Sequence, residues 1–422
     1  MTARILSRGL GKARMRRGWA AGVRQRFLVQ LQERLEMKIA VVSTMGYSSG
    51  GSEALWTEMA RTALGSGHEI AAVCFRWPET PAHLVDLQRR GARLLTRPLR
   101  QNRVSRVLTR FAAPLGSLRA FRPDVVLFNQ GASFDVVQDR EVRRFLRERV
   151  DRGPGAGFAY VIICHLNVEE EIPGDSDRRE IRRFFAAAHR VLAVSPRLLD
   201  TVRRQLADPL PNGLVVNNPV NLANSDQVAY PPMDGPVRMA CLGSLLPVKG
   251  WDILFESLAG DMWRSRDWRL TVAGDGHLRG YLSELAHYFG IADRIDFAGF
   301  VKNVRELWGC HHLMVFASRR EGGPMVVVEA LVCGRPVVST DVGLVSDWVR
   351  EGETGFIASA PTVRSFRAAL ERAWAAKPRW PEMGHRAHEF AVGRADPDPG
   401  GTLLRILCEV AGHSTPVGPA AK

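Results

Sequence analysis

The sequence predicts an α/β protein made of two Rossmann-like, doubly wound domains that face each other across a cleft. Three observations lead to this prediction. The chain has 422 residues, which is enough for two or three domains of roughly 150 residues each. Short β-branched stretches alternate with segments long enough for helices, a pattern typical of parallel sheets. A polar stretch rich in Pro and Asn, residues 218–236, interrupts this alternation.

The first half contains the opening β-loop-α unit. Residues 38–43 form a short β-branched strand, residues 47–52 a glycine-rich turn, and residues 53–64 have helical periodicity. Further strands are predicted at residues 69–75, 125–129, 160–165 and 191–195. We therefore predict an N-terminal domain over residues 37–220, followed by a linker over residues 221–236.

The second half repeats the scheme. Its predicted strands lie at residues 237–243, 269–273, 295–297, 313–317 and 336–339. We predict a C-terminal Rossmann-like domain over residues 237–390 and a C-terminal segment over residues 391–422. Ligands of such folds bind at the carboxyl ends of the strands, so we expect them in the cleft between the two domains.

Composition excludes several classes of protein. Hydrophobic residues make up 45% and charged residues 24%, which excludes a largely disordered or fibrous chain. No uninterrupted apolar run reaches about eighteen residues, so no transmembrane helix is predicted. The six cysteines lie far apart and form no CxxC pair, so neither a zinc site nor a disulfide framework is predicted. This usage of cysteine suits a reducing cytoplasm.

The net charge of +14 is unevenly placed. Residues 1–36 contain nine Arg or Lys against two Glu, and their arginines interrupt any apolar segment of a secretory signal. One interpretation is a basic arm or amphipathic helix at an anionic surface, with Leu28, Leu31 and Leu35 as its apolar stripe. The other, which we favour, is an upstream extension, because Met37 begins a segment that looks like a natural start.

The most informative segment follows the predicted strand at residues 313–317. Gly322 and Gly323 form a turn, Pro324 occupies the first helical position, and the helix continues to about residue 333. The backbone amides of Gly323, Met325 and Val326 are expected to point into the cleft. Together with the helix dipole, they would form a site for a phosphate group.

Two glutamates flank this predicted phosphate site. Glu321 precedes the helix, whereas Glu329 lies about 7.5 Å beyond Pro324 along the helix axis. One carboxylate can therefore contact a group beyond the phosphates while the other reaches back toward a ribose. A bare pair of glutamates with this spacing would more often be a cap and a solvated helix residue, but the flanking glycines and prolines favour a nucleotide site.

This segment resembles the retaining GT-B glycosyltransferases, a large group that includes bacterial mannosyl- and glucosyltransferases. The resemblance is strongest over residues 237–358 and thinner from Met37 onward. It implies that Glu321 and Glu329 match the Glu-x7-Glu motif, with Glu321 on the donor sugar hydroxyls and Glu329 on the nucleotide ribose. It also implies that the C-terminal helix, near residues 402–411, crosses back onto the N-terminal domain.

A second motif of the family matches Gly243 to Gly250. The resemblance implies that Lys249 binds the donor diphosphate and offsets the charge of the departing nucleotide. Ser244 stands where the family has an arginine, so part of the diphosphate clamp is missing. Either Arg319 or Arg320 replaces that arginine, or activity is weakened.

Further positions carry the resemblance less specifically, since tight turns also explain them. Gly274 and Asp275 lie in a strand-to-loop element near the nucleotide, and Phe300 and Val301 in a loop whose backbone contacts the base. In the N-terminal domain the family's glycine-rich turn approaches the donor phosphate and sugar with its backbone, and it matches the dipeptide Gly50 and Gly51.

His165 ends a predicted apolar strand, and we expect it to point into the cleft near the transferred sugar, as a His or other polar residue does in the family. Its imidazole can hydrogen-bond a sugar hydroxyl or the developing charge. Packing as a buried polar residue is the equal alternative.

The resemblance implies a hexosyltransferase-type glycosyltransferase. It would move a sugar from a nucleoside-diphosphate sugar to an acceptor hydroxyl of a glycan, a lipid-linked glycan or another cell-envelope glycoconjugate. It implies retention by front-face attack, without a metal or other cofactor, in the cytoplasm or at the inner face of the membrane. The alternatives are a sugar-nucleotide epimerase of the same architecture and a noncatalytic protein that binds nucleic acid or other polyanions, since the pI is about 10.2.

Two other patterns bear on partners. The Asp175/Asp177 and Asp396/Asp398 pairs mimic a metal-binding Asp-x-Asp motif, but neither follows a strand end, so we predict no catalytic metal. Arginines at three- and four-residue intervals predict an amphipathic helix, which suits an anionic membrane surface or, as we favour, an ordinary solvated face. These arginines are Arg97, Arg100, Arg103, Arg106 and Arg110. No nucleic-acid-binding module is recognised, so no specific nucleic-acid partner is predicted.

Overall fold

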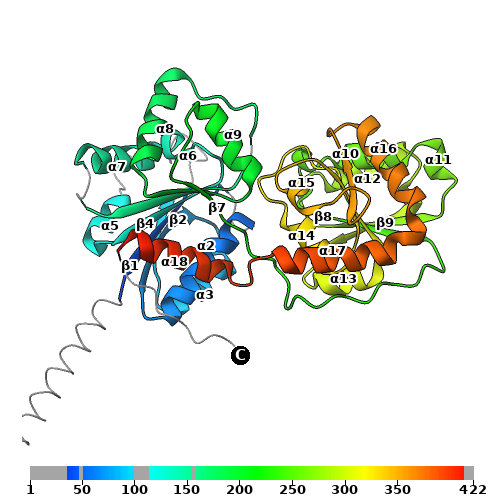
Figure 1. The fold of residues 1–422 in the computed structure, drawn as a ribbon, viewed down its shortest axis with the longest axis horizontal. Coiled ribbons are helices and arrows are strands. Elements are labelled where there is room, and N and C mark those ends of the chain that lie inside the picture. The colour runs from blue at the N-terminus through cyan, green and yellow to red at the C-terminus, as the bar shows by residue number, and fades with distance from the viewer. Residues whose placement is uncertain (1–35, 47–50, 99–113, 154–156, 167, 413–422) are drawn as a thin grey trace, which may run out of the picture.

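The computed structural model describes residues 36–46, 51–98, 114–153, 157–166 and 168–412. Two α/β lobes, each with its own parallel sheet, lie side by side (Figure 1). This arrangement confirms the predicted fold class. Some predicted features lie outside the described residues: the leader up to residue 35, Gly50, and the arginines at positions 100, 103, 106 and 110.

The first lobe contains a seven-stranded parallel sheet in the order β3-β2-β1-β4-β5-β6-β7. Its strands are β1 (Lys38–Ser43), β2 (Glu69–Arg76), β3 (Arg93–Pro98), β4 (Val125–Gln130), β5 (Ala159–Cys164), β6 (Arg190–Ala193) and β7 (Gly213–Val215). The direction of winding reverses between β1 and β4, which are neighbours. The carboxyl ends of these two strands therefore form the position where such sheets bind ligands.

Helices cover this sheet on both faces. They are α2 (Gly51–Gly65), α3 (Ala82–Arg89), α5 (Pro114–Phe121), α6 (Asp135–Gln138), α7 (Arg140–Asp151), α8 (Asp175–Ala187) and α9 (Pro196–Leu206). In Figure 1, α2 and α3 lie on one side of the sheet, and α8 and α9 lie on the other.

The second lobe contains a six-stranded parallel sheet in the order β10-β9-β8-β11-β12-β13. Its strands are β8 (Val237–Leu242), β9 (Trp268–Ala273), β10 (Ile295–Gly299), β11 (Leu313–Phe316), β12 (Val337–Thr340) and β13 (Gly355–Ala358). Its helices are α10 (Trp251–Leu258), α11 (Asp261–Arg264), α12 (Arg279–Tyr288), α13 (Val304–Cys310), α14 (Met325–Val332), α15 (Val345–Trp348), α16 (Val363–Ala375) and α17 (Trp380–Arg394).

Each lobe has its own hydrophobic core. The central strands β1, β4, β8 and β11 are apolar and almost wholly buried, as expected for parallel strands covered by helices on both faces. The largest buried side chains are unequally shared, since the second lobe holds most of the fully buried tryptophans. They are Trp251, Trp263, Trp268, Trp308 and Trp380, against Trp56 in the first lobe.

The last helix, α18 (Pro399–Val410), returns to the first lobe and packs on α2. Its residues Leu403, Leu407 and Cys408 belong to the first-lobe core. The chain therefore crosses between the lobes twice, after β7 and again between α17 and α18 (Figure 1). No helix in the described part of the chain is both long and apolar enough to span a bilayer.

The segment between β7 and β8 is fastened to the second lobe by buried polar groups. The fully buried guanidinium of Arg335 donates to the carbonyls of Val228 and Ala229 at 3.2 and 2.6 Å. Nε2 of His312 lies 2.9 Å from the carbonyl oxygen of Pro232, and the Tyr230 hydroxyl donates to the carbonyl of His312 at 2.7 Å. This part of the linker is thus packed as an extension of the second lobe.

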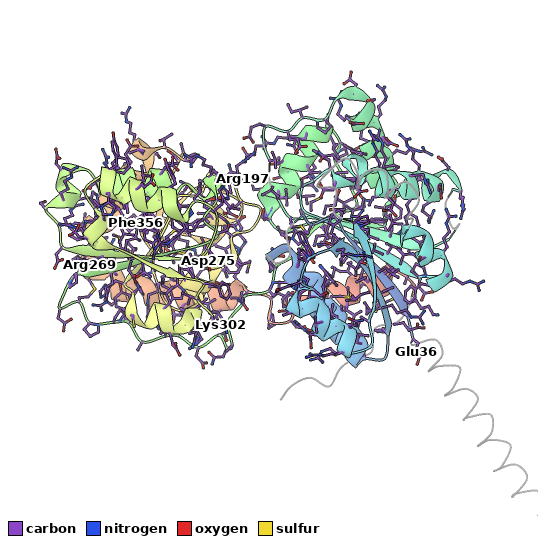
Figure 2. The ribbon with its side chains drawn as sticks, turned by 180° about the vertical axis from the view of Figure 1, so that it is seen from behind. Glu36, Arg197, Arg269, Asp275, Lys302 and Phe356 are labelled. Atoms are coloured by element: carbon purple, nitrogen blue, oxygen red, sulfur yellow. The ribbon has the colours of Figure 1, made fainter. Side chains whose placement is uncertain are left out.

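The lobes touch through a few polar contacts. Ser195 Oγ donates to the carbonyl of Gly322 at 3.0 Å, and Arg197 donates to the carbonyl of Asp341 at 2.9 Å. Figure 2 shows Arg197 at the junction of the lobes. A Cβ atom at Gly322 would overlap the carbonyl oxygen of His165, so only glycine permits this close approach.

The structure corrects several local predictions. Arg97 does not lie on an amphipathic helix; it belongs to β3 and is buried in an ion pair with Asp139. Pro324 precedes α14 as its N-cap instead of occupying the first helical position. Three short strands were not predicted, namely β3, β7 and β13.

Candidate functional site

A cleft of about 580 Å³ lies where α2 of the first lobe faces the N-terminus of α14. Several residues proposed from the sequence line it together: Gly51, Lys249, Phe300, Glu321, Gly323, Pro324, Met325, Val326 and Glu329. Others lie outside its lining: Ser244, Gly274, Asp275, Val301, Gly322 and His165. In Figure 2, Asp275 still lies on the side of the second lobe that faces the first.

Ser318 holds the loop that carries Glu321. Its hydroxyl lies 2.8 Å from Glu321 Oε1 and 3.1 Å from the carbonyl of Val248, and its own carbonyl accepts from Thr340 Oγ1 at 2.5 Å. Ser318 is fully buried, just after the end of β11. The Glu321 carboxylate is therefore fixed at the carboxyl end of the sheet by Ser318, which was not singled out from the sequence.

Glu321 and Lys249 form an ion pair across the cleft floor. Lys249 Nζ lies 2.6 Å from Glu321 Oε1, and both side chains are largely buried. The ammonium group also lies over the ring of Phe316 at 5.8 Å. Gly250, at φ +65°, permits this geometry, because a Cβ there would overlap the carbonyl of Ala317.

The N-terminus of α14 faces the same cleft. Its N-cap is Pro324, which has no side-chain oxygen to cap the first amides. Those amides and the positive end of the helix dipole are thus directed at the space beside Lys249. The arrangement suits an anion that carries more than one charge.

Glu329 lies one turn into α14 and is buried at 5% exposure, yet it lines the cleft. Burial raises its pKa to about 7, partly offset by a hydrogen bond from the backbone of Asn221 in the linker. A buried carboxyl group in a cleft whose pKa is raised toward neutrality is the kind of group that marks binding sites.

The neighbouring loops of the second lobe are packed backbone to backbone. The amide of Leu245 donates to the carbonyl of Asp275 at 2.9 Å, and the amide of Gly274 donates to that of Gly299 at 2.7 Å. A Cβ at Gly274, where φ is +149°, would overlap the carbonyl of Gly243. Gly274 and Asp275 therefore shape the wall behind the cleft instead of lining it.

Arg319 and Arg320 do not line the cleft. Arg319 forms two hydrogen bonds with Asp252, at 2.7 and 2.6 Å, and Arg320 pairs with Glu170 of the first lobe at 3.6 Å. Both line a separate pocket of about 350 Å³. Among the described residues that line the cleft, the permanent cations are Lys249 and Arg61, the latter contributed by α2.

His165 follows β5 by one residue and is buried at 7% exposure. Its Nε2 lies 2.8 Å from Asn129 Oδ1, and burial lowers its pKa to about 3. Its backbone carbonyl lies against Gly322, next to Glu321, whereas its side chain contacts Asn129 of the first lobe.

Apart from Gly51, the first-lobe residues that line the cleft were not predicted from the sequence. They are Glu53, Ala54, Thr57, Glu58, Arg61, His83 and Pro219, and Asn221 of the linker joins them. Most lie on one face of α2, with the spacing of successive helical turns. That periodicity, directly after the glycine-rich turn, was the signal that could have identified them.

The two Asp-x-Asp pairs, which the sequence analysis did not take as metal sites, form no metal-binding cluster in the described residues. Asp175 and Asp177 lie in the first turn of α8, where Arg178 and Arg143 pair with them. In the described ranges, no three His, Cys, Asp or Glu side chains are grouped as metal ligands would be. Metal independence stays a prediction.

Comparison with known proteins divides the chain at the same place as the fold. Residues 49–224 match the family described as Glycosyltransferase Family 4, and residues 236–376 match Glycosyl transferases group 1. The two matches correspond to the two lobes.

Individual relatives are similar over parts of the chain. The lipopolysaccharide core biosynthesis glycosyltransferase LpsE of Rhizobium meliloti is 31% identical over 236 residues, which is 55% of this chain and 59% of LpsE. The D-inositol 3-phosphate glycosyltransferase of Gordonia bronchialis is 34% identical over 36% of this chain and 35% of its own length. The chain thus matches between a third and three fifths of these two relatives.

Solved structures are similar over nearly the whole fold. The lipopolysaccharide outer core galactosyltransferase WaaB has a TM-score of 0.64 at 19% identity, covering 88% of this chain and 99% of WaaB. HepE of Anabaena, in complex with UDP and glucose, has a TM-score of 0.67 at 18% identity, covering 89% of this chain and 100% of HepE. At these identities the likeness establishes the fold.

Proposed function

The chain belongs to the GT-B glycosyltransferases, and from this membership we propose that it transfers a sugar from a nucleoside-diphosphate sugar to a hydroxyl of a cell-envelope glycan or lipid-linked glycan. The observation that carries the proposal is the Lys249–Glu321 ion pair beside the N-terminus of α14, with Glu329 buried one turn behind it. This arrangement suits a diphosphate with a polyhydroxylated group on each side.

In the proposed complex, the diphosphate lies between Lys249 and the first amides of α14. There the diphosphate would pair with the Lys249 ammonium group in place of Glu321. Glu321 is then free to accept hydrogen bonds from the sugar hydroxyls, while Ser318 keeps its carboxylate in place. Arg61, on the opposite wall, supplies positive charge that Ser244 cannot provide.

Glu329 is proposed to accept hydrogen bonds from the ribose hydroxyls. Because its pKa is about 7 when buried, two new donors favour its ionised form. Nucleotide binding should therefore release a proton near neutral pH, and affinity should rise as the pH increases from about 6 to about 8. Phe300, an exposed aromatic residue on the cleft rim, lies where it can cover the base.

We further propose that transfer occurs with retention and without a metal. Lys249 and the helix dipole would stabilise the leaving diphosphate as its charge develops. The leaving phosphate would then accept the acceptor proton during front-face attack, so that no protein nucleophile is needed. Closure of the lobes would exclude water from this step.

The first test is thermal stabilisation of the protein by UDP, GDP and ADP and by their sugar conjugates. A ligand at roughly a hundred times its Kd stabilises by about 2.7 kcal/mol. We expect one nucleotide family to stabilise the wild type and to lose this effect in Glu329→Ala, whereas the surface variant Glu284→Ala keeps it. Absence of stabilisation by every nucleotide would contradict the proposal.

Nuclear magnetic resonance of the product then tests the mechanism. Retention requires the anomeric configuration of the donor sugar to persist in the product; an inverted product would refute front-face transfer. Donor isomerisation without transfer to any acceptor would instead indicate an epimerase of the same architecture.

A further inference from the structure

A chain of buried hydrogen bonds extends from Glu53, on the first-lobe wall of the cleft, into the first lobe. Glu53, in the first turn of α2, accepts from Asn129 Nδ2 at 3.1 Å and from Ser43 Oγ at 2.7 Å through Oε1. Its Oε2 accepts from the indole N–H of Trp56 at 2.9 Å. Asn129, at the carboxyl end of β4, in turn places Oδ1 2.8 Å from Nε2 of His165.

The chemistry of these groups fixes the direction of the chain. A carboxylate only accepts hydrogen bonds, so the Asn129 amide must turn its NH₂ group toward Glu53. Ser43 Oγ already accepts from the amide of Met45 at 3.3 Å, so its proton is available to Glu53. The Asn129 carbonyl oxygen therefore faces His165, and Nε2 of His165 must be the protonated nitrogen.

The other imidazole nitrogen is then an acceptor without a donor. Burial keeps the ring neutral by lowering its pKa to about 3. Nδ1 is buried and has no hydrogen-bond partner among the residues that the structure describes. A buried acceptor that lacks a donor is unfavourable, because it has lost its bond to water and gained none, so this position favours a ligand that donates.

We propose that Glu53 and Asn129 are positioning residues that hold His165 in the Nε2–H tautomer, so that Nδ1 accepts a hydrogen bond from a hydroxyl of the transferred sugar. The identity of the ligand rests on the proposed function, whereas the tautomer is a property of the protein alone. The sugar contact proposed for Glu321 lies next to Gly322, whose backbone touches His165. Because Nδ1 is buried, sugar binding requires a shift of the atoms that cover it.

The test uses Glu53→Gln, which keeps the shape of the side chain but replaces one acceptor oxygen with an NH₂ group. The introduced amide would donate to Asn129 Oδ1 while its remaining oxygen keeps the bond from Trp56. The Asn129 amide would then turn over, donate to Nε2 of His165 and move the ring proton to Nδ1. The substitution thus reverses the direction of the hydrogen bonds from residue 53 through Asn129 to His165 and keeps a side chain of the same size at each position.

The measurement is the tautomer of His165 in the full chain labelled with ¹⁵N-histidine, without donor or acceptor. The signals are assigned by their absence from His165→Gln. We expect the Nε2–H tautomer in the wild type and the Nδ1–H tautomer in Glu53→Gln. Glu58→Gln makes the same chemical change on the same helix, outside the chain of bonds, and should keep the wild-type tautomer.

Either of two results would overturn the proposal. The first is an Nδ1–H tautomer of His165 in the wild type, a measurement that does not depend on whether a variant folds. The second is an unchanged tautomer in Glu53→Gln. Where the tautomer reverses, kcat/KM for sugar transfer should fall by roughly tenfold to a hundredfold, since one buried acceptor becomes a donor. Unchanged transfer would refute the contact with the sugar. If the wild type transfers no sugar from any donor, the proposed function fails, yet the spectra still decide the tautomer.

Discussion

Behind the lining of the cleft, the second lobe packs its loops backbone to backbone, whereas the first lobe holds its strand ends together with hydrogen-bonded side chains. In the second lobe, Gly250 and Gly274 allow loops to pack where any Cβ would overlap a carbonyl oxygen. In the first lobe, Glu53, Asn129 and His165 are held by one another's polar groups. The first arrangement requires that no Cβ atom is present at Gly250 and Gly274. The second requires the particular side chains that bond to one another.

This difference predicts which substitutions each wall tolerates. Loops that pack backbone to backbone should be destabilised by a single added methyl group, because peptide groups cannot move aside. A network of buried polar side chains should be destabilised when one partner is removed, because the others are left buried without a hydrogen bond. The four predictions below test this contrast.

The largest effect is expected for Gly274→Ala. The new methyl group would meet the carbonyl of Gly243, at a φ of +149° that an alanine rarely adopts. We expect a loss of about 4 to 5 kcal/mol in the free energy of unfolding, measured by urea denaturation. Gly235→Ala, where the added atom meets nothing within 4 Å, is the control. A Gly274→Ala protein as stable as Gly235→Ala would break the contrast at its strongest point.

The second prediction compares two arginines of β3. Arg97 is buried, pairs with Asp139 at 2.5 Å and donates to the carbonyl of Ser43, whereas Arg93 is 65% exposed beside Glu69. Arg97→Ala should destabilise by about 3 kcal/mol, near the lower end for a broken buried pair, because Asp139 keeps its backbone donors in α7. Arg93→Ala should change stability by less than about 1 kcal/mol. Equal unfolding midpoints for the two variants would show that the first lobe does not depend on its buried pair.

The third prediction concerns the floor of the cleft, where the two walls meet. Lys249→Met should lower kcat by about 10²- to 10³-fold, because the leaving diphosphate loses its nearest cation. Lys377→Met, at the outer surface of the second lobe beside Trp374, should keep wild-type kinetics. Steady-state transfer assays measure both. A Lys249→Met enzyme with normal kcat would remove Lys249 from the proposed mechanism.

The fourth prediction concerns Glu329→Gln, whose effect depends on pH and vanishes in acid. The folded-state pKa of about 7 lies above the ordinary value of 4.5, so the contribution of Glu329 to stability is complete below pH 4.5 and is lost as the pH rises through 7. Glutamine avoids this loss. The variant should therefore gain up to about 3 kcal/mol over the wild type at about pH 8.5 and almost nothing at about pH 4.5.

Thermal unfolding without nucleotide, at the two pH values, measures this difference. Glu284→Gln on the exposed surface of α12 serves as the comparison and should show no pH-dependent gain. A gain of equal size at both pH values would mean that burial of the Glu329 charge is not its cause.

The same contrast explains what the sequence could predict. In the second lobe, the signals are local: Gly322, Gly323 and Pro324 stand together, and Glu321 and Glu329 are separated by a fixed stretch of helix. Most strands of both lobes, though not β3, β7 and β13, were likewise visible as apolar runs. These features depend on neighbours in the chain, so a single sequence carries them.

The first-lobe network could not be predicted in this way. Glu53 and Asn129 are 76 residues apart, and Asn129 and His165 are 36 residues apart. Strand β3 was missed because its arginines interrupt the apolar pattern. Arg97 is compatible with a buried strand because it pairs with Asp139, 42 residues away, and donates to the carbonyl of Ser43. Such partners become visible only when the sheet order is known.

The contacts of Arg335 and His312 leave the two lobes with little free chain between them. Because residues 228–232 are fastened to the second lobe, the first crossing is reduced to the residues just after β7, and the second to the few residues between α17 and α18. Two domains that are joined by two short connecting segments rotate most easily about the line that runs through both segments. We therefore expect the lobes to open and close by rotation about one hinge axis. Each closure should then bring Lys249 and Glu321 back to the same face of α2.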